Sequence, residues 1–256
     1  MGDANFEESK QKIKELLKKV SEKTSPEEMA ILKKDFKETI KDANPLVIAA
    51  AEAEMMKEGA TIDDLMKACD VHLEMFKDVI RNPNLKVPAG HPIASFQEDH
   101  KNILSVMEKL IDEIKEAKKI GNAEDAVTEI RMIEKLADKL MDAENHNVRQ
   151  ENTLFPILER HGIEQPPAIM WHDHTEMKEQ KKELIKVLKA KETMPFETLI
   201  KRIEPLAMLL LEKFGSHTQK EENILYVTAM KVITEEEWKD IKEECDNLGY
   251  FKPGLF

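Results

Sequence analysis

Four long stretches of the chain repeat apolar residues at intervals of three and four positions, the spacing that places side chains on one face of an α-helix. Short runs containing asparagine, glycine or proline separate them. Helices of this length joined by short loops predict an all-α chain built around an antiparallel, up-down-up-down four-helix bundle. The four stretches cover about residues 91–119, 123–160, 167–190 and 196–231.

The composition excludes several classes of protein. Only 8 glycines and 5% aromatic residues in 256 argue against an all-β fold. A net charge of −12 without a basic run disfavours nucleic acid and membrane surfaces as partners. No apolar stretch approaches the roughly 18 residues that a membrane helix needs. Cys69 and Cys245 lie far apart and form no disulfide framework, so we expect a cytoplasmic protein.

Cap signals and turn residues divide the chain into parts. Residues 1–83 are expected to form a small helical domain of unknown function, whose helices begin near Ser25, Asn44 and Thr61. Residues 84–90, rich in proline and glycine, would form a linker. The bundle would cover residues 91–232. A last helix, capped by Thr234 and Glu237, and a tail would cover residues 233–256.

Each long helix carries one histidine on its apolar face: His100, His146, His174 and His217. One such histidine is usually an ordinary core residue with its hydrogen bonds made. Four buried imidazoles without partners would cost several kcal/mol, at roughly 1–3 kcal/mol each. A shared metal would satisfy all four. Two lie early and two lie late in their helices, so in an up-down-up-down bundle all four meet at one end.

Two of these histidines open a repeated sequence, HNVRQENTLFP at residues 146–156 and HTQKEENILYV at residues 217–227. Glu221 lies four residues after its histidine and Glu222 five, whereas the first copy has Gln150 and then Glu151. The pair Asp-His also occurs in both the first and the third helix, which indicates two related helical hairpins. Imidazole and carboxylate ligands together suit iron, zinc or manganese, and this set is large enough for two ions.

Histidine first and glutamate second, on four helices, resembles the hemerythrin-like family, also called HHE cation-binding domains. The motifs that carry the resemblance are FQEDHKNIL, HNVRQENTLFP, MWHDHTEM and HTQKEENILYV, and it covers roughly residues 90–232. The preceding segment, with SPEEMAILKKDF and CDVHLEMF, resembles an uncharacterised helical domain that often accompanies such bundles.

The resemblance implies a centre of two non-haem iron ions, bridged by oxygen and carboxylate, that binds or responds to O2, NO or related oxidants. The four histidines would be terminal ligands, and Glu151 with Glu221 or Glu222 would bridge. The sequence departs from oxygen-carrying members at two positions. Lys178 stands where those have a fifth histidine, which His91 or His172 could replace, and Gln150 interrupts the first His-x-x-x-Glu pattern.

Three functions follow as hypotheses. The first is a non-enzymatic di-iron protein that binds or senses O2, NO or redox state, with the N-terminal domain contacting a protein partner. The second is an iron-handling or repair factor, or a di-iron enzyme acting on NO or peroxide. The third is a metal-free helical interaction module. No catalytic residue is predicted, since the chain has neither a glycine-rich phosphate loop nor a serine-centred elbow.

Overall fold

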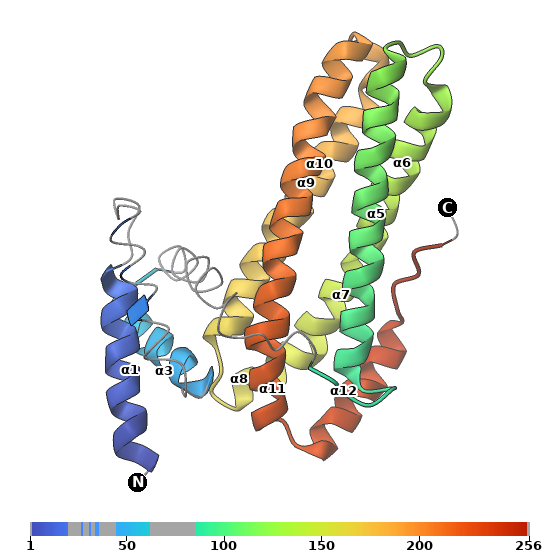
Figure 1. Cartoon of the computed structure of the whole chain (residues 1–256). Coiled ribbons are helices and arrows are strands. Elements are labelled where there is room, and N and C mark those ends of the chain that lie inside the picture. Colours follow the sequence, from blue (N-terminus) through green and yellow to red (C-terminus); the bar gives the residue numbers. More distant parts are fainter. Residues whose placement is uncertain are drawn as a thin grey trace. The chain divides into compact units, whose positions relative to one another are not determined.

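A computed structural model describes residues 2–19, 27, 31, 34–35, 45–61 and 85–254 of the chain (Figure 1). In the N-terminal part it contains α1 (Gly2–Lys19) and α3 (Pro45–Lys57). Pro45 begins α3 and Gly59 follows its end with φ +99°, a conformation that glycine adopts without strain, so the helix expected after Asn44 is confirmed. The helices expected at Ser25 and Thr61 lie outside the described residues, as does Cys69.

The C-terminal part contains the four long helices, and two of them change their winding near one end. Between Gln150 and Leu154, and again between Glu221 and Leu225, the chain forms a short π-helix. No strand occurs in the described ranges, and the all-α fold with a helical bundle is confirmed. The elements are α5 (Pro92–Ile120), α6 (Val127–Asp142), α7 (Glu144–Arg149), η1 (Gln150–Leu154), α8 (Phe155–Arg160), α9 (Gln165–Lys189), η2 (Lys191–Thr193), α10 (Phe196–Lys220), η3 (Glu221–Leu225), α11 (Tyr226–Val232) and α12 (Glu235–Leu248).

Capping residues that are recognisable in the sequence determine where α5 and α12 begin. His91 caps α5, Pro92 takes its first position, and Gly121 ends it with φ +84°. Thr234 and Glu237 form the predicted capping box at the start of α12, each side chain bonding to the other's backbone N–H. These signals explain why the predicted helix limits differ from the observed ones by only a few residues.

The apolar faces meet in one core along the bundle, which includes Ile103, Leu136, Leu184 and Leu210 from the four helices. The order of the helices around this core follows from lysine–glutamate pairs at their edges. Such pairs connect α5 to α10, α10 to α9 and α9 to α7, while α5 packs along α6. The pairs are Lys118–Glu204, Lys213–Glu176 and Lys181–Glu144.

By its internal contacts the chain divides into two compact units. One contains residues 1–86, 157–170 and 219–233, and the other residues 87–156, 171–218 and 234–256. The domain limits expected from the sequence, at residues 83, 90 and 232, stay a prediction. Among the described helices, none combines the length and the apolar character needed to cross a membrane.

Candidate metal centre

Both copies of the repeated sequence carry a π-helical turn directly after their histidine. His146 lies in the last turn of α7, and η1 begins four residues later at Gln150. His217 lies in the last turn of α10, and η3 begins four residues later at Glu221. A π-helical turn accommodates one extra residue and changes which side chains point inward, and such turns occur frequently at functional sites. The repeat is therefore a repeat of backbone geometry as well as of sequence.

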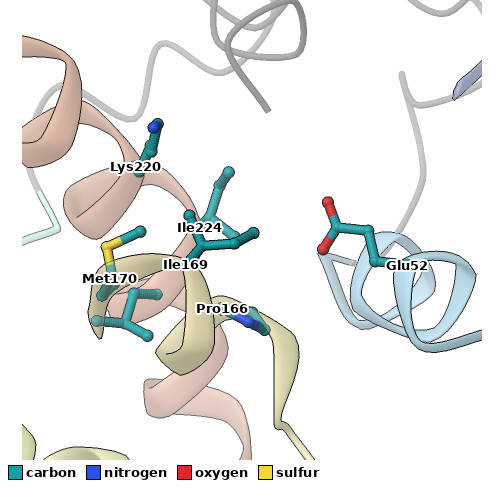
Figure 2. A pocket seen from close by; sticks show the side chains of 7 residues that line it. Glu52, Pro166, Ile169, Met170, Lys220 and Ile224 are labelled. Carbon is teal, nitrogen blue, oxygen red and sulfur yellow. The ribbon is translucent and has the colours of Figure 1, made fainter. Parts of the chain in front are cut away.

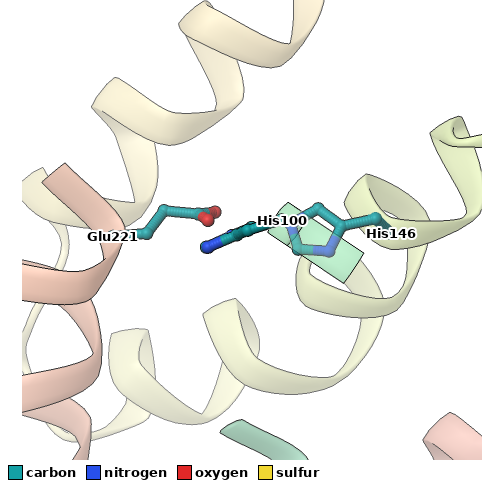
Figure 3. Close-up of side chains that lie close together, drawn as sticks. All are labelled: His100, His146 and Glu221. Carbon is teal, nitrogen blue, oxygen red and sulfur yellow. The ribbon is translucent and has the colours of Figure 1, made fainter. Parts of the chain in front are cut away.

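The four predicted histidines form two groups around one glutamate. His100, His146 and Glu221 form the first group, shown in Figure 3, and His174, His217 and Glu221 form the second. Within each group the potential ligand atoms all lie within 4.8 Å of one another, and every member is buried. Glu221 is fully buried and is the only residue common to both groups. A carboxylate shared in this way is suited to bridging two ions.

An aspartate orients one histidine in each hairpin. His146 Nδ1 lies 3.2 Å from Asp99 Oδ2, and His217 Nδ1 lies 3.1 Å from Asp173 Oδ2. Because a carboxylate only accepts hydrogen bonds, Nδ1 carries the hydrogen in both imidazoles. This leaves the lone pair on Nε2, the nitrogen that faces the centre. A carboxylate behind a histidine in this way fixes a metal ligand and raises its basicity.

The second histidine pair brings two ring nitrogens very close together. His174 Nδ1 lies 2.8 Å from Glu151 Oε1, so in the neutral ring Nδ1 carries the hydrogen and Nε2 carries the lone pair. His174 Nε2 lies only 3.1 Å from His217 Nε2. Two lone pairs at this separation repel unless a proton or a cation lies between them. Since a metal–nitrogen bond is about 2.0–2.1 Å long, both nitrogens can bind a single ion, and the residues present fit a metal.

The two positions that begin the π-helical turns carry different groups. Gln150 Nε2 lies 3.0 Å from His146 Nε2. The corresponding residue in the second copy, Glu221, accepts a hydrogen bond of 3.0 Å from the Tyr226 hydroxyl through Oε2. In the first copy a neutral amide is therefore hydrogen-bonded to the histidine. In the second copy the corresponding residue is the carboxylate that belongs to both histidine groups.

The sequence patterns did not indicate Arg149, the largest fully buried side chain among the described residues. Its guanidinium donates to Asp99 and to Ser95 Oγ, the latter at 3.1 Å. The distance from Arg149 Cζ to the ring centroid is 5.1 Å for Phe96 and 4.7 Å for Tyr250. Arg149 therefore compensates the charge of the carboxylate that orients His146. The only signal in the sequence was a basic residue three positions after the histidine in both copies.

Other predicted residues lie outside the two groups. His91 Nδ1 accepts from the Ile93 backbone N–H at 3.2 Å, its ring packs on Trp238, and burial lowers the pKa of His91. Glu151 lies on His174 Nδ1, as described above. Glu222 is partly buried beside Glu221. His172 is about a third exposed, with Nε2 3.7 Å from Glu176 Oε1.

A small pocket borders the helix that carries Glu221. Its walls come from the start of α9 and from the end of α10 with η3, and Glu52 of α3 completes it (Figure 2). Glu52 and Lys220 are both buried although the rest of the lining is mostly apolar. Lys220, which lines the pocket, directly precedes Glu221 in the chain. The lining residues are Glu52, Pro166, Ile169, Met170, Lys220, Ile224 and Leu225.

Antiparallel helices that bury four imidazoles around a shared carboxylate define a metal-binding four-helix bundle. The sequence model of the hemerythrin HHE cation binding domain matches residues 91–229, more than half of the chain, and the chain belongs to this family. A family of unknown function, DUF438, matches residues 13–82. Both resemblances drawn from the motifs are thereby confirmed. A search of curated proteins finds no match.

Proposed function

We propose that this chain is a non-haem di-iron protein that binds or senses O2, NO or redox state without turning over a substrate. Membership of a cation-binding family supports the metal, and the proposal adds the element, the number of ions and the small ligand. The observation that carries it is the place of Glu221 in two histidine groups at once. One carboxylate between two imidazole pairs is an arrangement for two neighbouring ions.

The donor set favours iron over a structural zinc site. Structural zinc sites are built from Cys and His with four ligands, and neither described group contains a cysteine. Two iron ions would supply reversible changes of oxidation state and coordination positions for a small ligand. The residues of the chain would fix and shield them: Asp99 and Asp173 orient two ligands, and the buried site excludes bulk water.

The N-terminal region is the candidate for contact with a protein partner. Lys220, the neighbour of Glu221 in the chain, and Glu52 of α3 line the same pocket. A shift of the backbone at Glu221 on metal binding would therefore move Lys220 and change the surroundings of Glu52. Hydrogen exchange of residues 45–57, measured with and without bound iron, tests this route. Unchanged protection of α3 would contradict it.

The test of the di-iron function is metal content with an optical spectrum, on protein loaded with Fe2+ under anaerobic conditions and then oxidised. We expect about two iron ions per chain and near-ultraviolet charge-transfer bands. His146→Ala with His217→Ala removes one ligand from each group and should remove both signals. His161→Ala, an exposed histidine at the end of α8, is the matched control.

Each outcome has a defined meaning. One zinc per chain, or no metal in the wild type, would overturn the di-iron proposal and favour the interaction module. Two iron ions per chain together with catalytic consumption of NO or peroxide would support the di-iron centre and would show that the protein is an enzyme.

A further inference from the structure

The two histidine pairs differ at one buried position, four residues after the histidine. That position is Gln150 in the first copy and Glu221 in the second, and both side chains are fully buried. Both begin a π-helical turn, so their backbones have the same relation to the histidine before them. The side chains have similar size and shape, and they differ in charge and in the ability to donate hydrogen bonds.

The hydrogen bond of Gln150 uses the atom that a metal needs. Asp99 takes the Nδ1 hydrogen of His146, so Nε2 has a lone pair and the amide N–H of Gln150 must be the donor to it. An ion that binds His146 Nε2 has to displace this hydrogen bond. The amide can then offer only a neutral oxygen, which stabilises a cation less than a carboxylate does.

The second pair is arranged in the opposite sense. The Nε2 atoms of His174 and His217 face each other at 3.1 Å, and each ring has a carboxylate on Nδ1. Without a cation or a proton the two lone pairs repel, so an ion here relieves an unfavourable contact. At the first pair, in contrast, an ion has to break the favourable hydrogen bond between Gln150 and His146.

Resting on the proposed function, we infer that the two metal positions are unequal. Glu221 belongs to both positions. The position at His174 and His217 binds its ion tightly, whereas the position at His100 and His146 binds weakly and exchanges its ion, because Gln150 competes for His146 Nε2. The protein then passes between a one-ion and a two-ion form as the concentration of free metal changes. Gln150 is the residue that sets this threshold.

The experiment is an anaerobic titration of the full chain with Co2+, followed by visible absorption, and with Fe2+, followed by equilibrium dialysis and elemental analysis. The wild type should bind one ion tightly and a second roughly 10- to 100-fold more weakly. His146→Ala should remove the weak ion and keep the tight one. His174→Ala should remove the tight ion.

The decisive variant is Gln150→Glu, which should strengthen the weak position by about 10- to 100-fold. Gln219→Glu is the charge-matched control, because Gln219 is exposed and lies two residues after the other histidine. This control should leave both affinities unchanged. Circular dichroism before and after metal addition shows that each variant is folded.

The outcomes separate the inference from the function on which it rests. Two ions bound with equal affinity, or loss of the weak ion in His174→Ala rather than in His146→Ala, would overturn the inequality while leaving a di-metal protein. An unaltered weak position in folded Gln150→Glu would overturn the role of the glutamine. Absence of any bound metal in the wild type would overturn the proposed function itself. If Gln150→Glu does not fold, the wild-type titration with the two histidine variants still decides the inequality.

Discussion

The two helical hairpins of the bundle, residues 92–160 and 165–232, repeat their orienting contacts but not their ligand charge. In each hairpin, an aspartate of the first helix is hydrogen-bonded to the histidine of the second helix. The pairs are Asp99 with His146, and Asp173 with His217. The position four residues after that histidine is an amide in one hairpin and a carboxylate in the other. The contact that orients a histidine and the charge at the position four residues after it thus come from different residues, and one can change without the other.

The surroundings of the hairpins differ as well. The helix α12 packs on α5, α7 and η1, all in the first hairpin. It brings Cys245 to 3.7 Å from Thr153 Oγ1, and the segment after it places Tyr250 over Arg149. Burial raises the pKa of the Cys245 thiol, which therefore stays protonated and packs as a small apolar group. The first hairpin is thus covered by α12 and by the segment after it, and it also contains the position that we infer to bind its ion weakly.

The largest expected effect concerns the buried guanidinium of the first hairpin. Arg149→Ala leaves the charge of Asp99 buried without its cation, which should lower the free energy of unfolding by about 3–5 kcal/mol. Urea denaturation of the metal-free chain, followed by circular dichroism, measures this. Arg131→Ala on exposed α6 surface should change stability by less than about 0.5 kcal/mol. A similarly small change for Arg149→Ala would show that its contact with Asp99 contributes little to the stability of the first hairpin.

The next effect converts the second hairpin into a copy of the first. Glu221→Gln removes the one carboxylate common to both histidine groups, so both metal positions should weaken, the tight one by about 100-fold or more. Equilibrium dialysis against Fe2+ followed by elemental analysis measures the loss. Glu222→Gln, at the neighbouring position, is the matched variant and should have a smaller effect. If Glu222→Gln proves the more damaging, the bridging role belongs to that residue.

The comparison of hairpins also shows what a sequence can and cannot specify. Apolar spacing placed His100, His146, His174 and His217 on inward faces, and short loops fixed their meeting at one end, because helical periodicity and chain direction are local properties. The choice between Glu221 and Glu222 was left open, since positions four and five after a histidine lie on neighbouring faces of an α-helix. The π-helical turn decides which points inward, and no apolar pattern marked it.

Arg149 shows a second limit, since arginine is usually a surface residue. Its burial depends on Asp99 and Tyr250, each far from it in the chain, and only the folded structure brings the three together. Glu151 is a third case. The resemblance to the family made it a bridging candidate, which stays a prediction, and in the structure its Oε1 lies 2.8 Å from Nδ1 of His174, in a different helix.

The smallest expected effect concerns the residue five positions after the shared glutamate. Tyr226 donates to Glu221 Oε2 at 3.0 Å, while the same position in the first copy is Phe155, which stacks on His174. The copy with Glu221 therefore has a tyrosine hydroxyl at this position, and the copy with Gln150 has none. Tyr226→Phe should weaken the tight metal position by roughly 3- to 10-fold, since a hydrogen bond to a charged group is lost but the ligand remains. In Co2+ titrations the weak position should change less than the tight one. An equal change at both positions would mean that the hydroxyl orients Glu221 toward both ions, and the two hairpins would then share one electrostatic environment.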